Sequence, residues 1–406
     1  MSNVAISLEE IDLSDPDIYV PRVPHEIFAL LRREDPVHFN PERKGPGFWA
    51  VTRYEDIRTV HRDAETFSSE VGGITLEELA PENVEARKSM IDMDPPRHDE
   101  LRGIVNRRFT PNAVTVWEDL VRKTVTEVLD EALPLAEFDF VEHIASEIPM
   151  RVFADIMGIP QEERREIVRL GNRLVGRQDP EYGVEPEEED PMLPFSSPVA
   201  LEMFEIGRRL AATRSNDPRD DLVTQLVFEQ LTAHEYDLYF LLLAVAGNET
   251  TRHTLSFGLL AFLEHPDELE RLRRDPTLFP TATEEILRWA TPVLHFRRTA
   301  TRDVELGGKT IAAGDKLTTW FVSGNRDEEV FPDGDVFDVA RSPNPHMTFG
   351  PGGVHHCLGA HLARMEIKIA FEELLRRNVE FEVAGPVERL RSNLGNGIKR
   401  LPVIVR

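Results

Sequence analysis

The stretch FGPGGVHHCLGAH, residues 349–361, holds Cys357, the only cysteine of this 406-residue chain. Its four glycines let the backbone approach something flat or bulky without interference from Cβ atoms. A helical pattern resumes directly after the cysteine, so the thiol is predicted at the start of a helix. Unpaired amides and the positive end of the helix dipole stabilise a thiolate there, and the thiolate is the form that binds metals or attacks electrophiles.

Several chemistries compete for this segment. A zinc site could combine Cys357 with His355, His356 or His361, but zinc sites usually draw on two separated ligand clusters, and the rest of the chain offers no second cysteine. A nucleophilic Cys–His pair needs a base placed by tertiary structure, and the glycines have no part in it. An axial thiolate to a haem iron uses both the thiol and the glycines. A buried structural cysteine is the remaining alternative.

Composition limits the class of protein. No Gly/Ser-rich or low-complexity linker divides the chain, so residues 1–406 are predicted to form a single domain. Acidic residues number 73 against 47 basic ones, and the net charge of −26 argues against nucleic acid or an anionic membrane as a partner. One cysteine excludes an internal disulfide framework, and no apolar run resembles a signal peptide or a spanning helix. We therefore expect a soluble, cytoplasmic protein.

Hydrophobic periodicity predicts a mainly α protein. Apolar residues recur every three or four positions in segments 24–34, 113–133, 198–214 and 362–377. Alternating β patterns are fewer and shorter, and they are expected to form small sheets at the margin of a helical body. They occur at 47–53, 297–321 and 399–405.

The stretch 178–198 is rich in proline and glutamate and has no hydrophobic period. It is predicted to be a mobile surface loop between two helices. Long loops of this kind often act as lids, and a merely solvated insertion is an equal alternative.

A long buried helix is predicted from residue 232 to about 263. Thr232 and Glu235 have the spacing of a capping box, and the following residues are apolar on nearly all sides. Into this helix the chain places Asn248, Glu249 and Thr250, although an unpaired buried carboxylate is costly. The cluster is either a satisfied polar network or a polar notch that faces a cofactor.

The cysteine segment resembles the haem-binding signature of the cytochromes P450, which are haem-thiolate monooxygenases. Further stretches agree in the family's order, from about residue 20 to the end of the chain. They are DPPRHDELR (94–102), AGNETT (246–251), EEILR with Glu285 and Arg288, TPVLHFRRTA (291–300), and FDVAR with Arg341.

The resemblance departs from the family pattern at one point. The family's phenylalanine usually lies seven residues before the cysteine, whereas Phe349 lies eight before Cys357, so the glycine loop is one residue longer. Either Gly352 or Gly353 could take the tight-turn role, and Gly353 is assigned to it. The longer loop together with AGNETT is similar to bacterial members that oxidise sterols, terpenoids and branched fatty chains.

The resemblance implies a P450 fold, haem b as the cofactor, and a role for each matching residue. Cys357 is implied as the iron ligand, and cationic donors on several segments are implied as partners of the haem propionates. Glu249 and Thr250 match the pair that delivers protons during dioxygen activation, which indicates use of O2. Glu285, Arg288 and Arg341 are implied as a buried bracing network. The cofactor-binding residues so implied are His98, Arg102, Arg298, Phe349, Gly353, His355, Cys357 and Gly359.

The same resemblance implies hydroxylation of an unactivated C–H bond in an apolar substrate such as a sterol, terpenoid or fatty-acid-like compound. Electrons must come from a separate ferredoxin and its reductase, because the chain has no flavin domain or nucleotide fingerprint. Arg107, Arg108 and Arg364 are hypothetical docking residues on a monomeric protein. The alternatives are natural-product tailoring and a non-catalytic haem sensor. Substrate contacts are expected from 70–90, 178–198, Val245, Ala246, Val293, Phe296 and the turn near Leu394.

Overall fold

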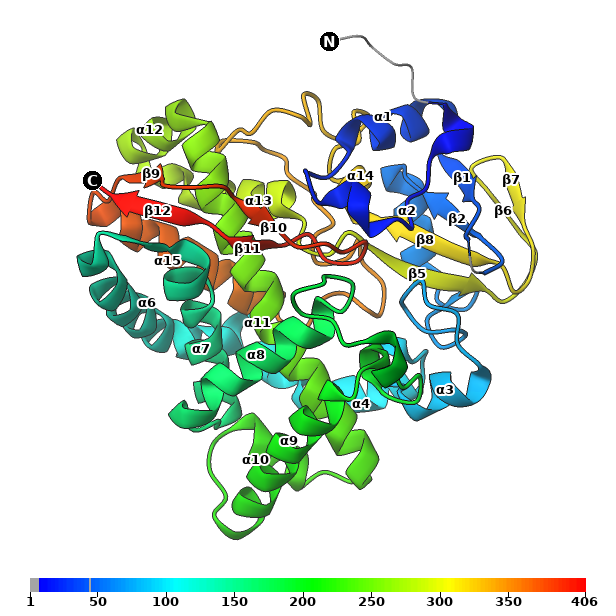
Figure 1. Ribbon diagram of the computed structural model, residues 1–406, viewed down its shortest axis with the longest axis horizontal. Helices are drawn as coiled ribbons and strands as arrows, with labels where there is room; N and C mark the ends of the chain where they lie inside the picture. Colours follow the sequence, from blue (N-terminus) through cyan, green and yellow to red (C-terminus); the bar gives the residue numbers. More distant parts are fainter. Residues whose placement is uncertain (1–6, 44) are drawn as a thin grey trace.

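The computed structural model describes residues 7–43 and 45–406 (Figure 1). Helices make up most of the molecule, and the largest sheet lies at one side of them, as the mainly α prediction requires. The helices are α1 (His25–Glu34), α2 (Tyr54–Arg62), α3 (Pro81–Ala86), α4 (Arg97–Asn106), α5 (Pro111–Val114), α6 (Glu118–Ala132), α7 (Glu147–Met157), α8 (Arg164–Val175), α9 (Val199–Asn216), α10 (Leu222–Val227), α11 (Ala233–Glu264), α12 (Pro266–Arg274), α13 (Phe279–Ala290), α14 (Phe321–Gly324) and α15 (Ala360–Arg376).

The strands form four small sheets. Strand order in the largest is β1-β2-β8-β5-β3, with β2 and β8 parallel and the other neighbours antiparallel. The prediction of strands in small sheets is therefore confirmed, because segments 47–53, 297–321 and 399–405 all contribute strands. The strands are β1 (Val37–Asn40), β2 (Phe48–Val51), β3 (Phe67–Ser68), β4 (Glu137–Asp139), β5 (His295–Ala300), β6 (Val304–Leu306), β7 (Lys309–Ile311), β8 (Lys316–Trp320), β9 (Phe381–Val383), β10 (Glu388–Arg389), β11 (Ile398–Arg400) and β12 (Pro402–Val405).

Helix α11 runs through the middle of the helical body (Figure 1). The predicted capping box is present, because Thr232 Oγ1 accepts from the Glu235 amide at 3.2 Å and Glu235 Oε2 accepts from the Thr232 amide at 2.8 Å. The helix packs against α7, α8, α9, α13 and α15. Since neighbours cover it on several sides, its sequence is apolar nearly all round rather than on one face.

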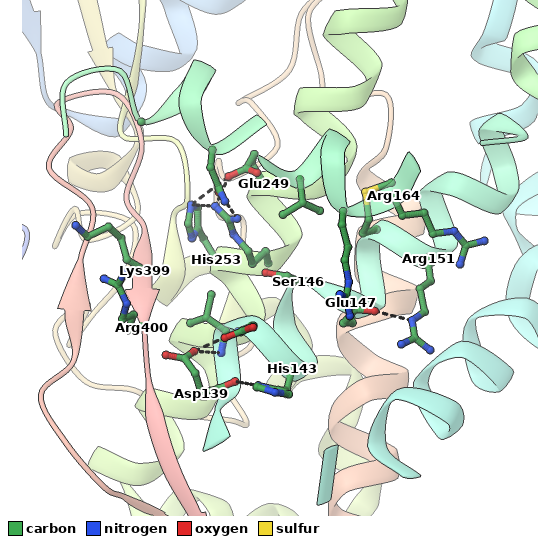
Figure 2. A pocket seen from close by; sticks show the side chains of 18 of the residues that line it. Asp139, His143, Ser146, Glu147, Arg151, Arg164, Glu249, His253, Lys399 and Arg400 are labelled. Carbon is green, nitrogen blue, oxygen red and sulfur yellow. Dashed lines mark hydrogen bonds and ion pairs between the residues drawn. The ribbon is translucent and has the colours of Figure 1, made fainter. Parts of the chain in front are cut away.

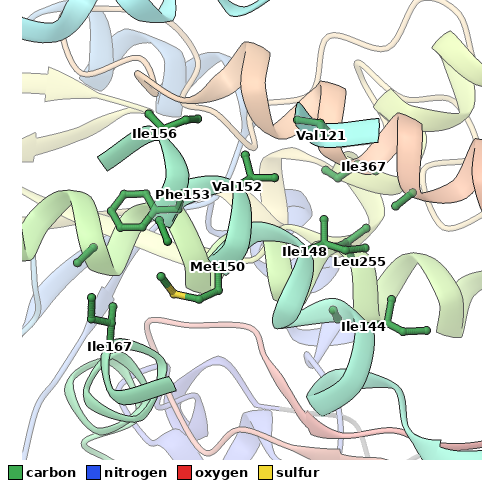
Figure 3. Close-up of a cluster of buried hydrophobic side chains, with 14 of the residues drawn as sticks. Val121, Ile144, Ile148, Met150, Val152, Phe153, Ile156, Ile167, Leu255 and Ile367 are labelled. Carbon is green, nitrogen blue, oxygen red and sulfur yellow. The ribbon is translucent and has the colours of Figure 1, made fainter. Parts of the chain in front are cut away.

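The main hydrophobic core fixes α15, the helix that follows the cysteine. Figure 3 shows Ile148 and Val152 of α7 among Val121 of α6, Leu255 of α11 and Ile367 of α15, and each of these side chains is buried. Burial of one such side chain stabilises the fold by about 1.5–3 kcal/mol. The start of α15, and Cys357 with it, is therefore held in place by three other helices.

The stretch 178–198 is a loop between α8 and α9, as predicted, but it is anchored at both ends. Asp179 is buried near its start and accepts from Lys399 Nζ at 3.1 Å and from the Arg391 amide at 3.0 Å. Near its end, Ser196 Oγ accepts from Arg87 at 3.0 Å. None of the described helices has both the length and the apolar character that crossing a bilayer requires.

Candidate active site

A largely apolar cavity separates α11 from the cysteine loop. Ala246, Thr250 and Thr254, spaced four residues apart, present one face of α11 to it, and Cys357 and Gly359 line it from the opposite side. Val293 and Phe296, both expected as substrate contacts, line it as well, whereas Val245, Leu394 and the loop 178–198 do not. The apolar lining includes Met90, Phe153, Ile156, Leu222, Leu242, Leu243, Val293, Phe296 and Phe321.

The Cys357 thiol lies just before α15, as the sequence predicted. The Cys357 amide donates to the Phe349 carbonyl at 2.8 Å, which closes the loop, and the exposed cysteine lines the cavity. Burial raises the pKa of the thiol, and the amides of Gly359 and Ala360 oppose the rise by donating toward the sulfur. The cysteine therefore lines the cavity with amide donors already directed at its sulfur.

The structure decides between the two candidate turn glycines. Gly352 and Gly353 both have positive φ, at +103° and +83°. A Cβ on Gly353 would collide with the backbone carbonyl of His61, whereas one on Gly352 would meet only the flexible Arg62 side chain at 3.3 Å. Gly353 is the position where the loop touches another backbone, although it does not line the cavity.

Nitrogen donors converge at one end of the cavity. His98 and His355 lie with ring centroids 4.4 Å apart, and Arg102 and Arg298 line the same cavity. Burial lowers the pKa of His355 to about 2, with Arg298, His98 and Arg102 adding to the effect, and burial lowers the pKa of Arg298 to about 10. Among the described residues, neither arginine forms an ion pair with a carboxylate, and His355 Nε2 has no hydrogen-bond partner. Such a cluster calls for an anionic group.

Alternation along β5 separates Arg298 from its neighbour Arg297. Phe296 and Arg298 point to the cavity face of the strand. Arg297 points away and donates to the Glu77 carbonyl at 3.0 Å. Arg298, which the resemblance implied, is therefore the cavity residue, and Arg297 is not.

These observations fit a haem. The Cys357 thiol would supply the iron ligand, and Arg102, Arg298 and His355 Nε2 would supply donors to the haem propionates. A Cβ on Gly359 would meet no atom within 4 Å, so a flat group can pass along the wall there. The zinc alternative gains no support, since no three His, Cys, Asp or Glu side chains of the described chain gather as a metal site.

Glu249 and Thr250 lie on different faces of α11. Thr250 lines the apolar cavity, and its hydroxyl donates to the Ala246 carbonyl at 3.1 Å. The Glu249 carboxylate is buried against Arg252 and accepts from Asn248 Nδ2 at 3.2 Å. Consecutive helical residues point about 100° apart, so the two members of the predicted proton-delivery pair face different cavities in this structure. Gly247 does not interrupt the helix; it makes room for Phe153, whose ring a Cβ would approach to 2.6 Å.

Glu249 instead borders a second, polar cavity of about 900 Å³, shown in Figure 2. His253, also from α11, points into it, and Lys399 and Arg400 line it from β11. Burial raises the pKa of Glu249, and Arg252 and Asn248 oppose the rise. One turn of α11 thus separates a polar cavity from an apolar one.

The predicted bracing network is present. Glu285 and Arg288 are buried and pair at 2.7 Å, and Arg341 Nε lies 3.2 Å from Glu285. Arg288 also donates to the carbonyls of Asn325 and Gly334. The network ties α13 to the segment that leads into the cysteine loop.

Two of the three expected docking arginines are engaged in ion pairs. Arg108 lies 2.6 Å from Asp220, and Arg364 lies 2.7 Å from Glu284. Arg107 is exposed and, in the part of the chain that the structure describes, has no ion-pair partner. Of the three hypothetical members of the docking patch, Arg107 alone has no ion-pair partner among the described residues.

Sequence reasoning missed two ionisable residues of the apolar cavity, His61 and Glu366. His61 is buried on α2, and its Nε2 lies 2.9 Å from Thr319 Oγ1. No motif marks it, because only the fold brings α2 to the cavity. Glu366 on α15 is buried, and burial raises its pKa to about 8. Glu366 lies four residues from both Leu362 and Ala370, so the sequence placed an acid on an apolar helix face. This spacing could have predicted a buried glutamate.

Known proteins resemble this chain over nearly its whole length. The cytochrome P450 family profile matches residues 200–400. A steroid C26-monooxygenase of Mycobacterium tuberculosis is 37% identical, covering 97% of this chain and 92% of that protein. A methyl-branched lipid omega-hydroxylase of the same species is 41% identical, covering 93% of this chain and 90% of that protein.

Solved structures of cytochromes P450 also resemble this chain over nearly its whole length. A Mycobacterium marinum cytochrome P450 in complex with pseudoionone is 39% identical, with a TM-score of 0.89, covering 97% of this chain and 98% of that one. A cytochrome P450 of Novosphingobium aromaticivorans is 34% identical, with a TM-score of 0.88, covering 97% of this chain and 99% of that one. With the thiol, the glycine loop and the long α11 in the arrangement described above, the chain belongs to the cytochrome P450 family and is a haem-dependent monooxygenase.

Proposed function

We propose that this enzyme hydroxylates an unactivated C–H bond of an apolar compound of the steroid, terpenoid or methyl-branched lipid class. The observation that carries the proposal is the apolar cavity, whose aliphatic and aromatic lining ends at the Cys357 thiol. The names of the steroid and branched-lipid relatives point to the same substrates. A hydrophobic pocket distinguishes one methylene by only about 1–3 kcal/mol, so the proposal names a class and not a compound.

We infer that haem b is the cofactor and that Cys357 is its axial ligand. When bound, the haem supplies the iron centre at which O2 is activated for insertion of one oxygen atom into the substrate. The chain's own part is to hold the thiolate with amide donors and to pair the propionates with buried cations. The residues proposed to hold the haem from the cavity wall are His98, Arg102, Arg298, Phe349, His355, Cys357 and Gly359, and Gly353 is proposed to hold the loop in shape through its close approach to the His61 backbone.

We infer that Glu249 and Thr250 move protons from the polar cavity to the apolar one. Glu249 borders the polar cavity, its raised pKa lets it hold a proton, and Thr250 lies on the next helical position at the apolar wall. A change of the Glu249 rotamer away from Arg252, with water between the two side chains, would complete the relay. The relay therefore requires rotation of a side chain and no movement of the backbone.

We further infer one domain spanning residues 1–406 that acts as a monomer and receives electrons from a ferredoxin and its reductase. The acidic chain favours docking at a local basic site, and Arg107 is exposed and free of ion pairs within the described residues. The single cysteine, assigned to haem, leaves none for a disulfide, which suits the reducing cytoplasm.

A ligand screen followed by one substitution tests the proposed function. Steroids, terpenoids and methyl-branched lipids are screened for the spectral change that accompanies loss of water from ferric haem. With the best ligand, Thr250→Ala is expected to keep that change but to lose at least about tenfold of product formed per electron consumed, because proton delivery supports catalysis by roughly 10²–10⁴-fold.

Thr254→Ala is the matched control, because Thr254 lines the same cavity one turn later and bonds the Thr250 carbonyl at 2.8 Å. Full coupling in Thr250→Ala, or equal losses in both variants, would reject the relay. Absence of any responding apolar ligand would reject the substrate class.

A further inference from the structure

We propose that Glu284, His346 and Arg364 are positioning residues that set the reduction potential of the haem-thiolate centre, by fixing the Phe349 ring and the charge beside Cys357. Glu284 lies on α13 and Arg364 on α15, while His346 and Phe349 belong to the segment between β8 and α15. The inference rests on the proposed assignment of Cys357 as the haem ligand. It gives Arg364, expected from sequence to dock a redox partner, an internal role.

The Arg364 guanidinium is held between a carboxylate and an aromatic ring. Its Nε and Nη2 donate to the two oxygens of Glu284 at 2.7 Å and 2.9 Å, which is a bidentate pair. Its Cζ lies 4.5 Å from the centroid of the Phe349 ring, within cation–π range. The Phe349 carbonyl in turn accepts from the Cys357 amide. The cation is thus coupled to the cysteine through a single residue.

His346 holds the other side of the carboxylate. Its Nδ1 accepts from the Thr348 amide at 3.3 Å, so Nε2 carries the proton and donates to Glu284 Oε2 at 2.9 Å. Although burial raises the pKa of Glu284, the hydrogen bonds from His346 and Arg364 hold it at about 2. At neutral pH the cluster therefore contains one carboxylate, one guanidinium and a neutral imidazole.

The two charges act on the sulfur in opposite senses. The Arg364 guanidinium lies over the Phe349 ring and pairs with Glu284, and the Phe349 carbonyl accepts from the Cys357 amide, so both charges are placed beside the cysteine loop. A positive charge favours the state of the centre that carries an extra electron, and a negative charge disfavours it. Loss of the Arg364 charge should make the potential more negative, and loss of the Glu284 charge should make it less negative.

A docking role makes a different prediction. A cation that only attracts a redox partner changes the rate of electron arrival and its salt dependence and leaves the potential unchanged. Loosening of the loop by either substitution would admit water, and its effect on the potential would have the same sign in both variants. Opposite signs are therefore specific to the proposed arrangement.

The experiment is a spectroelectrochemical titration of the ferric/ferrous couple in haem-loaded protein. Relative to wild type, Arg364→Gln is expected to shift to a more negative potential and Glu284→Gln to a less negative one, while Arg364→Lys, which keeps the charge, stays near wild type. Arg376→Gln is the matched control, because Arg376 lies on the same helix, pairs with Glu373 at 2.7 Å and is 70% exposed. It should leave the potential unchanged.

Shifts of the same sign in Arg364→Gln and Glu284→Gln, or no shift in either, overturn the proposal. If Arg364→Gln does not retain haem, Glu284→Gln decides alone, and a potential that is unchanged or more negative overturns it. The absorption spectrum of the carbon monoxide complex of the reduced wild type distinguishes a wrong haem-thiolate assignment from a wrong role for the cluster. Lack of the red-shifted band of thiolate ligation rejects the haem-thiolate assignment itself, whereas a normal band with unmoved potentials rejects only the role of this cluster.

Discussion

At the scale of single residues, the site depends on buried nitrogen groups that lack an anionic partner or a hydrogen bond. Arg298 is buried without a carboxylate among the described residues, and His355 Nε2 has no hydrogen bond. Buried donors of this kind are costly unless a ligand satisfies them. The same donors that would destabilise the protein without haem therefore favour haem binding.

Gly353 provides a test of the loop at this scale. Gly353→Ala should lower the free energy of unfolding and the haem content of the purified protein, because an alanine at φ +83° is strained by about 1–3 kcal/mol and its Cβ also meets the His61 carbonyl. Chemical denaturation and the haem-to-protein absorbance ratio measure the two effects.

Gly352→Ala is the control for backbone strain alone. Its φ of +103° carries a similar penalty, but the Arg62 side chain beside it can move. Equal losses in the two variants would contradict the close contact assigned to Gly353.

At the scale of elements, one turn of α11 faces two environments. Thr250 belongs to the face with Ala246 and Thr254 that lines the apolar cavity, and Glu249 belongs to the face that borders the polar cavity (Figure 2). The helix can therefore serve as a partition with an ionisable group on one side and a hydroxyl on the other. Residues that are consecutive in the sequence therefore point in different directions on a helix.

Helix α13 carries the prediction for this scale. Glu285→Ala should destabilise the protein by about 3–5 kcal/mol and reduce haem retention, because Arg288 and Arg341 lose the carboxylate between them. Urea unfolding and haem content measure the change. The control is Glu118→Ala, which removes a half-exposed i,i+4 pair with Arg122 and should cost less than about 1 kcal/mol. Normal haem content in Glu285→Ala would contradict the bracing role.

At the scale of the whole molecule, buried neutral histidines make stability depend on acidity. His295 of β5 is buried with its ring centroid 4.4 Å from that of Trp320. Burial lowers its pKa from 6.5 to about 3, and the nearby Asn393 backbone opposes this. Between these two values the unfolded chain binds a proton that the folded chain excludes.

The stabilisation from neutral His295 is therefore present above pH 6.5 and is lost as the pH falls toward 3, by up to about 1.4 kcal/mol per pH unit. The stability of His295→Phe should be less sensitive to acid. Its urea midpoint should therefore rise relative to that of the wild type as the pH is lowered from 7 to 5. His234→Gln, at an exposed histidine, is the control. Parallel midpoint curves for wild type and His295→Phe would exclude this cause of acid sensitivity.

Much of the fold followed from local patterns. The capping box of α11, the helix after Cys357 and the marginal strands were predicted, because hydrophobic period and caps act within a few residues. Anchoring of 178–198 by Asp179 was not predicted, because its partners Lys399 and Arg391 lie more than two hundred positions away. Pairings of this kind depend on how the elements pack.

The sequence by itself identified Cys357 as the proposed iron ligand, the glycine loop before it, the capped helix opposite and the ordered motifs that mark a cytochrome P450. Only the tertiary structure decided that Gly353 meets the His61 carbonyl, that Glu249 turns away from Thr250's cavity, and that Arg364 is bound to Glu284. The reason is physical: residue type and spacing fix what a side chain can do, while its partners are set by contacts between segments far apart in the chain.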